Sequence, residues 1–154
     1  MKCDVTTLAA PIVVREITLR DAAAAAVLSG ELGYPASVEE MEQRIRDLPA
    51  RNDHAVFVAC LPEERVVGWI DVAITHHLQA DPYGEIGGLV VSGEVRSAGI
   101  GRRLLAEAEQ WVSDRGIKRM VVRSRVSRED AHRFYERERY SRTKTSAVFS
   151  KDLE

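Results

Sequence analysis

The fold of this chain is decided by the segment Leu89-Val90-Val91-Ser92-Gly93-Glu94-Val95-Arg96-Ser97-Ala98-Gly99-Ile100-Gly101-Arg102-Arg103-Leu104-Leu105. Its apolar start predicts a strand, and its end opens an amphipathic helix that ends at Gly116. Between the two, Gly99 and Gly101 let the backbone turn with its N–H groups unobstructed at the positive end of the helix dipole. Fixed positive charge surrounds that end at Arg96, Arg102 and Arg103. Such a turn is a natural binding site for a pyrophosphate.

Residue spacing limits which phosphate ligand this turn can hold. A P-loop needs Gly-x-x-x-x-Gly-Lys followed by Ser or Thr, and the sequence contains no such run. A dinucleotide-binding turn needs a third glycine at the position where Leu104 stands. A Gly-x-Gly by itself is also compatible with a purely structural turn.

The composition is that of one globular domain. The chain has 154 residues, 45% hydrophobic and 30% charged, which suffices for a substantial core. It lacks a run of the roughly 18–20 apolar residues that a membrane span needs, and its start lacks a secretory apolar region. Cys3 and Cys60 make neither a disulfide framework nor a metal cluster, so we expect a reducing, cytoplasmic location. Neither cysteine has the neighbouring His and Asp that would activate a nucleophile.

Charge is distributed unevenly along the chain. Residues 1–95 hold seven Lys and Arg against fifteen Asp and Glu, whereas residues 96–142 hold thirteen against seven. The basic segment suits an anionic ligand and the acidic segment a cationic one, although solvated helix faces would give the same bias. We expect no nucleic-acid partner, because interleaved aromatic residues, a helix-turn-helix pattern and a basic pI are absent from the sequence.

The hydrophobic pattern predicts one mixed α/β domain, with antiparallel hairpins early and β-helix-β units late. Ser37 and Glu40 form a capping box at the start of a helix that stops near Pro49. The paired glycines Gly87-Gly88 inside a strand suggest a bulge or a close backbone approach. Asp81-Pro82-Tyr83-Gly84 is expected to form the turn before that strand. The expected strands are 12–17, 55–61, 66–74, 85–91, 120–122 and 145–149, and the expected helices are 22–32, 38–48, 100–116 and 128–137.

Two motifs in this order resemble those of the GCN5-related N-acetyltransferase (GNAT) superfamily. Arg96-Ser97-Ala98-Gly99-Ile100-Gly101 is similar to the family's Arg/Gln-x-x-Gly-x-Gly/Ala between a strand and a helix, and Ala131-His132-Arg133-Phe134-Tyr135-Glu136 to its late Ala-x-x-Phe-Tyr-Glu. Leu32-Gly33-Tyr34-Pro35 looks similar to small bacterial acetyltransferases. The resemblance implies a single-domain GNAT fold, with a mixed, mostly antiparallel twisted sheet, splayed central strands and about four flanking helices. This domain would span residues 12–154, with 1–11 as an N-terminal extension.

The resemblance also implies acetyl-CoA as the cofactor, with CoA as product. The pantetheine arm would hydrogen-bond to the main chain of Leu89, Val90 and Val91, and Gly87-Gly88 would ease the bulge there. The C-terminal wall of the cofactor site would include Arg128 and Ala131. The pyrophosphate would be held by the residues of the turn, which are Arg96, Ser97, Ala98, Gly99, Ile100, Gly101, Arg102 and Arg103.

For catalysis, the resemblance implies that Tyr135 is the general acid that protonates the leaving thiolate. Glu85 stands where many members place the carboxylate that accepts the proton of the amine, and Asp71 in the neighbouring strand is a second candidate. A core aromatic and a solvent-exposed strand end are the structural alternatives for Tyr135 and Glu85. We expect Tyr34 and Asp71 on the acceptor side. The histidines form no metal site: His76-His77 relays a proton or lies at the surface, and His54 starts a strand.

The chain departs from the family pattern at three positions. Ser97 stands where Gly is frequent, Arg128 where many members have Asn, and Arg139 where most have Gly. Because that Gly supplies a positive φ after a helix, we expect strain or a shifted turn at Arg139.

The expected function is the transfer of acetyl from acetyl-CoA to the primary amine of a small, cationic acceptor or a peptide. The amine would attack directly in a ternary complex, without a covalent enzyme intermediate. The acidic first half of the chain would attract a polyamine, an aminoglycoside or a basic N-terminus. The alternative is a catalytically weak acyl-CoA-binding sensor or interaction module, which Arg128 and Arg139 favour. Neither a membrane partner nor a metal is expected, and family habit allows a homodimer.

Overall fold

The computed structural model describes residues 11–95 and 98–154, which fall into two compact units, Met1–Val122 and Arg123–Glu154. The first unit contains a β-sheet and three α-helices, and the second contains one further α-helix, α5. Within the described ranges, no helix is both long and apolar enough to cross a lipid bilayer.

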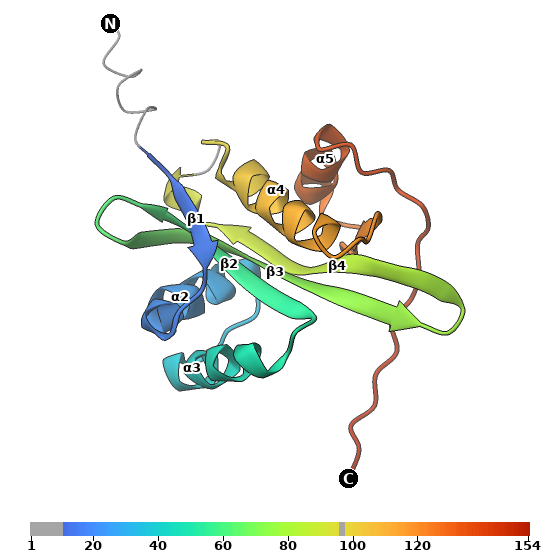
Figure 1. Ribbon diagram of the computed structural model, residues 1–154, viewed down its shortest axis with the longest axis horizontal. Helices are drawn as coiled ribbons and strands as arrows, with labels where there is room; N and C mark the ends of the chain where they lie inside the picture. The colour runs from blue at the N-terminus through green and yellow to red at the C-terminus, as the bar shows by residue number, and fades with distance from the viewer. Residues whose placement is uncertain (1–10, 96–97) are drawn as a thin grey trace, which may run out of the picture. The chain divides into compact units, whose positions relative to one another are not determined.

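The first unit is built on a five-stranded sheet whose strands follow one another in chain order (Figure 1). Neighbouring strands are antiparallel, except that β4 and β5 are parallel. This arrangement confirms the predicted mixed, mostly antiparallel sheet. The strands are β1 Val13–Glu16, β2 His54–Leu61, β3 Arg65–His77, β4 Ala80–Val91 and β5 Met120–Val122.

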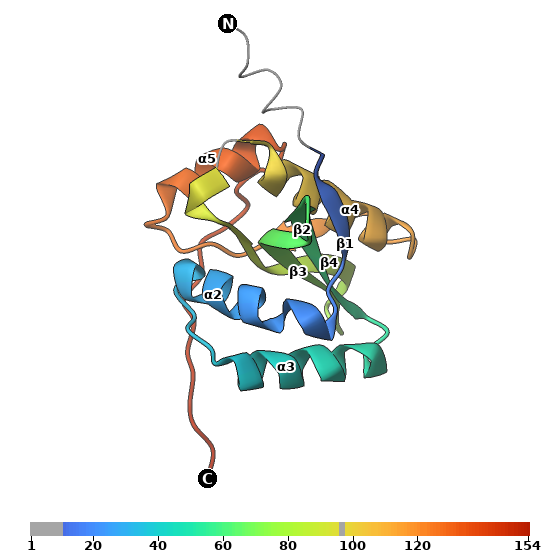
Figure 2. The ribbon, with the colours of Figure 1, turned by 90° about the vertical axis from the view of Figure 1, so that its left-hand side faces the viewer.

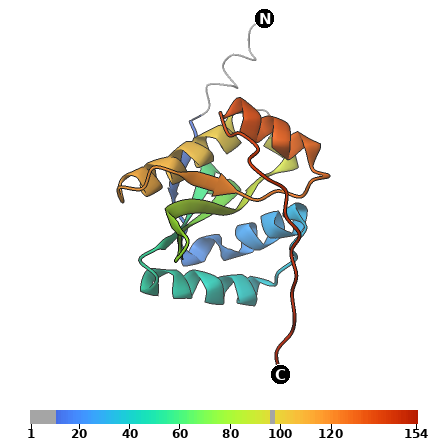
Figure 3. The ribbon, with the colours of Figure 1, turned by 90° about the vertical axis from the view of Figure 1, so that its right-hand side faces the viewer.

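Three helices cover the two faces of this sheet (Figures 2 and 3). Helix α2, Ala22–Leu32, lies against one face with α3, Val38–Asp47, packed on it, and α4, Ile100–Ser113, lies against the other face. Small side chains let α2 and α3 approach closely, in a cluster formed by Ala22, Ala25, Ala26, Met41 and Ile45. The face of α4 that contacts the sheet is a buried stripe at helical spacing, formed by Ile100, Leu104, Leu105, Ala108 and Val112.

The predicted capping box begins α3. The Ser37 hydroxyl accepts a hydrogen bond from the Glu40 amide at 3.0 Å, and the Glu40 carboxylate accepts one from the Ser37 amide at 2.9 Å. Two of the helix's first N–H donors are thereby satisfied by side chains only three residues apart, which is why this boundary could be predicted from the sequence.

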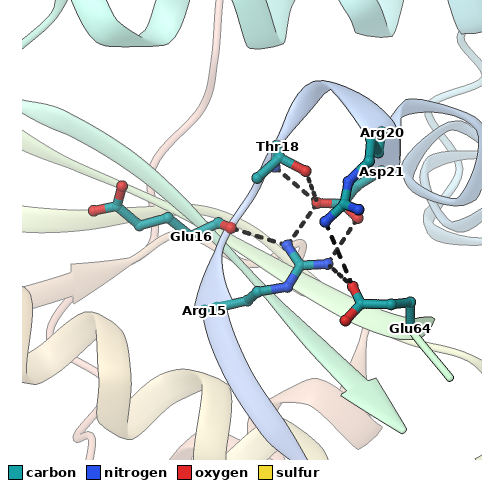
Figure 4. Close-up of polar contacts among 6 residues, drawn as sticks. All are labelled: Arg15, Glu16, Thr18, Arg20, Asp21 and Glu64. Carbon is teal, nitrogen blue, oxygen red and sulfur yellow. Dashed lines mark hydrogen bonds and ion pairs between the residues drawn. The ribbon is translucent and has the colours of Figure 1, made fainter. Parts of the chain in front are cut away.

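A buried ion pair fixes β1 to the start of α2 (Figure 4). The Asp21 carboxylate, 5% exposed, accepts hydrogen bonds from both terminal nitrogens of Arg15, at 2.8 and 2.9 Å. It also accepts from the amide and hydroxyl of Thr18, at 2.7 and 3.1 Å. Burial opposes ionisation of Asp21, but the bonds from Arg15 and Thr18 outweigh burial and lower its pKa below the usual value. The network therefore sets the direction in which α2 leaves the sheet.

The predicted turn at Asp81-Pro82-Tyr83-Gly84 is wrong. β4 already begins at Ala80, and the hairpin closes through Leu78 and Gln79, with His77 paired to Ala80. Pro82 is tolerated because β5 pairs with β4 only from Gly84 to Ile86. At Pro82 the strand therefore has a neighbour on one side alone, and the missing N–H costs no ladder bond.

In the second unit, α5 spans Glu129–Arg137, with Arg128 as its N-cap residue. Arg139 adopts the left-handed conformation, with φ at 74°, which confirms the strain expected there. The amides of Arg139 and Tyr140 donate to the carbonyls of Glu136 and Tyr135, so the turn is a Schellman motif with Arg at the position glycine favours.

The predicted closing strand at 145–149 is wrong. Residues 141–154 carry no regular element and are exposed, including the side chains of Val148 and Phe149. A strand must pair its N–H and C=O groups with a neighbour, and residues 123–154 contain no other strand. The alternating side chains of residues 145–149 would form a strand only if a partner strand lay beside them.

Candidate active site

The first part of the site is an open helix N-terminus. Gly99 caps α4 with φ at 79°, and a Cβ built on it would meet nothing within 4 Å. The first intrahelical bond runs from the Arg103 amide to the Gly99 carbonyl at 3.1 Å. The amides of Ile100 and Gly101 precede that bond, so they lie in the first turn, whose N–H groups have no acceptor within the helix.

These residues fit a pyrophosphate. The cap is exposed, its amides lie at the positive end of a 14-residue helix, and the Arg102 side chain is exposed beside it. Arg103 is held differently from the prediction, because its guanidinium donates to the Ile12 carbonyl at 2.8 Å. The predicted Arg96 and Ser97 lie outside the described residues.

The second part of the site lies where β4 and β5 separate. Their pairing ends at Ile86 and Val122, whereas β4 continues to Val91 with β3 as its partner on the other side. The predicted cofactor-binding stretch Leu89–Val91 thus lies beyond the last β4–β5 pair. The register also slips at Gly87, since Asp71 pairs with Gly88 while Val72 pairs with Ile86, and this confirms the predicted bulge.

The third part is a carboxylate beside that bulge. Asp71 points to the α2 side of the sheet, as does Trp69 two residues earlier, whose indole N–H donates to the Ala25 carbonyl at 3.2 Å. A Cβ built on Gly87 would lie 2.6 Å from Oδ1 of Asp71. Glycine at position 87 therefore leaves room for the carboxylate directly over β4.

His54 holds the other side of this carboxylate. Its Nε2 lies 2.9 Å from Oδ2 of Asp71, and both side chains are partly buried. The hydrogen bond to Asp71 raises the pKa of His54, against the effect of burial, and Arg51 lowers it while Asp53 raises it. Sequence reasoning missed this pairing, because 17 residues separate the partners and only the β2–β3 register brings them together.

Glu85 lies on the same face as Asp71. It pairs with Ala73, two residues along β3 from Asp71, and its carboxylate accepts a hydrogen bond from the Thr75 hydroxyl at 3.0 Å. The sheet thus brings both predicted carboxylates to one face, on neighbouring strands.

A cavity of about 260 Å³ opens between α2, α3, β2 and β3. His54 and Asp71 line it, and most of its other walls are apolar, including Ala25, Met41, Ile45, Val56 and Trp69. The predicted acceptor residue Tyr34 is not among its lining residues; its side chain is exposed on the loop after α2. His76 and His77 are also outside it, and His77 Nε2 contacts the Tyr83 hydroxyl at 3.1 Å.

Tyr135, Arg128 and Ala131 lie in the second unit, on α5 or at its N-cap. The Tyr135 ring contacts Phe134 and Tyr140 edge-on, with centroids 5.1 and 5.7 Å away. Burial raises the pKa of the Tyr135 phenol, with Arg128 acting in the opposite direction. The hydroxyl is therefore protonated at neutral pH and able to donate a proton.

Cys60 is buried in β2, and burial raises the pKa of its thiol. A thiol of this kind is a weak nucleophile, so the described site offers no cysteine for covalent catalysis.

Comparison with known proteins gives one consistent family. The Acetyltransferase (GNAT) family matches residues 23–139. An aminoglycoside N(6′)-acetyltransferase type 1 of Stenotrophomonas maltophilia is 30% identical over 145 residues, covering 92% of this chain and 94% of that protein. An aminoalkylphosphonate N-acetyltransferase of Salmonella typhimurium is 35% identical over 118 residues, covering 76% of this chain and 73% of that protein.

The fold agrees with these relatives. A solved aminoglycoside N-acetyltransferase in complex with CoA aligns with a TM-score of 0.82 at 15% identity, over 94% of this chain and 97% of that one. With the helix N-terminus, the parted strands and the family match together, the chain belongs to the Acetyltransferase (GNAT) family and is an N-acetyltransferase that uses acetyl-CoA.

Proposed function

We propose that this enzyme transfers acetyl directly to the primary amine of a small acceptor whose amine is a cationic ammonium when free in water. The observation that carries the proposal is the Asp71 carboxylate, which His54 holds over the β4 bulge and which lines a cavity. A carboxylate there binds an ammonium group next to the strand that would receive the pantetheine arm.

Binding of acetyl-CoA would use mostly main-chain groups. We propose that Leu89, Val90 and Val91 receive the pantetheine arm and that the start of α4 receives the pyrophosphate, together with Arg128 and Ala131. Acetyl-CoA supplies the activated acetyl thioester. The residues proposed for the pyrophosphate are Arg96, Ser97, Ala98, Gly99, Ile100, Gly101, Arg102 and Arg103.

Catalysis requires that the bound ammonium lose a proton before its nitrogen can attack. Glu85 is the proposed base, acting directly or through water, and Asp71 is the second candidate for that role. Tyr135 is the proposed acid for the leaving thiolate, since burial raises its pKa and so keeps the hydroxyl protonated at neutral pH. With Cys60 buried, direct attack needs no covalent enzyme intermediate.

The relatives' names support an amine acceptor, since they specify an aminoglycoside in one case and an aminoalkylphosphonate in the other. Tyr34 is proposed for the outer acceptor side, because its ring is exposed on the loop that follows α2. We further propose a cytoplasmic enzyme with residues 12–154 as its domain and 1–11 as an extension. A homodimer is proposed because the exposed apolar residues of 141–154 would be covered by a second copy.

The test is thermal unfolding with and without acetyl-CoA, followed on the same sample by thiol release against a panel of amines. A ligand at 100 times its dissociation constant stabilises the native state by about 2.7 kcal/mol. A shift in melting temperature with thiol release supports the proposal and begins to identify the acceptor. A shift without release from any amine would favour the acyl-CoA sensor, and no shift at saturating acetyl-CoA would contradict the cofactor site.

A further inference from the structure

The cavity between α2, α3 and the sheet is lined by side chains of both charges. The Asp71 carboxylate lines it next to Gly87 of β4. Arg44 and Asp47 of α3 line it as well, together with Arg51, which follows the short helix Leu48–Ala50.

Apart from His54 and Asp71, the charged residues that line the cavity are two arginines and one aspartate. Arg44 and Arg51 both line it and both are exposed. Asp47 offsets only one of these charges, and its carboxylate already accepts a hydrogen bond from the Gln43 amide group at 3.0 Å. Arg51 also affects His54, because its positive charge lowers the pKa of the imidazole. Two guanidinium groups at the mouth of a small cavity form a binding site for an anionic group.

The neighbouring Arg46 lies on the same helix but does not line the cavity. It pairs with Glu42 one turn earlier at 4.0 Å. Of the two arginines of α3, only Arg44 lines the cavity, and it also lowers the pKa of Glu40 one turn earlier.

We infer that the acceptor is a small amine that also carries an acidic group, its ammonium at Asp71 and its phosphonate or carboxylate at Arg44 and Arg51. This inference rests on the proposed function and names its substrate class. The volume of about 260 Å³ lies just below the usual 300–1,000 Å³ of small-molecule pockets, so it suits a small molecule. A polycation would bring further ammonium groups against the two arginines, which repel them.

Binding measured without turnover tests the inference independently of catalysis. Isothermal titration calorimetry on the CoA-saturated protein compares 2-aminoethylphosphonate with ethanolamine, which has the amine but no acid. We expect the phosphonate to bind at least tenfold more tightly. The double variant Arg44→Gln/Arg51→Gln should reduce that preference at least tenfold, whereas the matched control Arg46→Gln should leave it unchanged.

Three results would overturn the inference: equal binding of the two amines, a preference that survives the double variant, or tighter binding of the polycation kanamycin. Thiol release from acetyl-CoA is then measured with the same acceptors. Selective binding of the phosphonate without release from any amine would retain the inferred ligand class and contradict the proposed transferase function. Release that favours ethanolamine would retain the transferase and reject the acidic acceptor.

Discussion

The start of α4 and the cavity beside α2 are built in different ways, although both belong to the first unit. The helix start is one continuous segment in which main-chain amides would bind the ligand, and Gly99 supplies the required φ. The cavity draws His54, Asp71 and Arg51 from separate elements and depends on side chains. Binding of acetyl-CoA should therefore depend on the backbone and the charge of a single turn. Binding of the amine acceptor should depend on individual side chains that come from different parts of the sequence.

The largest effect is expected at the helix start. Gly101→Glu would place bulk and negative charge at the proposed pyrophosphate site, so we expect acetyl-CoA affinity to fall at least about 1,000-fold in calorimetry. Gly30→Glu is the matched control, because Gly30 is an exposed helical glycine with open space around it. Normal affinity in a folded Gly101→Glu protein would remove the basis for the cofactor site.

Asp21→Asn should cost about 3 kcal/mol in the free energy of unfolding, because it breaks a buried ion pair and leaves Arg15 without its main partner. The pKa of Asp21 is below its usual 3.8, so its stabilising effect is present above that pH and is lost as pH falls through the folded-state pKa. Urea unfolding at pH 7 and pH 2.5 measures both effects. A variant as stable as the wild type at pH 7 would show that the network does not hold α2.

Asp71→Asn should lower kcat/KM for the amine about 100-fold and leave the dissociation constant of acetyl-CoA unchanged. The change removes the negative charge while keeping the shape, and the cofactor would contact other residues. Asp53→Asn is the matched control, since Asp53 is exposed and lies near His54 without lining the cavity. A loss of acetyl-CoA affinity in Asp71→Asn would mean that the two parts of the site are not separable.

Arg139→Gly tests a region outside both parts. We expect it to stabilise the protein by about 1 kcal/mol, because glycine adopts the left-handed conformation without the strain that Arg139 bears. Thermal unfolding measures the gain, and Arg137→Gly, inside α5, should instead destabilise by a similar amount. An unchanged or lower stability in Arg139→Gly would indicate that the arginine side chain offsets its own strain.

The smallest effect concerns the pH dependence of the His54–Asp71 pair. The pKa of His54 is raised above 6.5, so the charged pair stabilises the fold fully below pH 6.5 and this contribution is lost as pH rises through the raised value. The stability difference between wild type and His54→Asn should be larger at pH 5.5 than at pH 9, by less than about 1 kcal/mol. A difference that grows with pH would contradict a charged pair.

The regions predicted best are those whose structure depends on residues close together in the sequence. The capping box of α3 and the amphipathic α4 depend on residues a few positions apart, and both were predicted correctly. The bulge at Gly87 was also predicted, since paired glycines are unfavourable in a regular strand.

The errors arose where a partner strand decides the structure. Pro82 indicates a turn unless a strand edge accommodates it, and Thr145–Phe149 indicates a strand only if a neighbour pairs with it. The contact between His54 and Asp71 could not be predicted from neighbouring residues, because it depends on the register between β2 and β3. Sequence reasoning therefore predicted the start of α4 and the β4 bulge better than the side chains that line the cavity.

The use of main-chain amides at the start of α4 has a consequence for how such an enzyme can diversify. Every residue except proline carries a main-chain N–H, so the proposed recognition of acetyl-CoA would survive most substitutions in this turn, provided that Gly99 keeps its conformation. The proposed recognition of the acceptor depends on side chains, so exchanging Arg44 or Arg51 would alter which molecules bind. Duplicated copies of this gene could therefore acquire new acceptors by a few changes in α3 and the segment that follows it while keeping the same acyl donor.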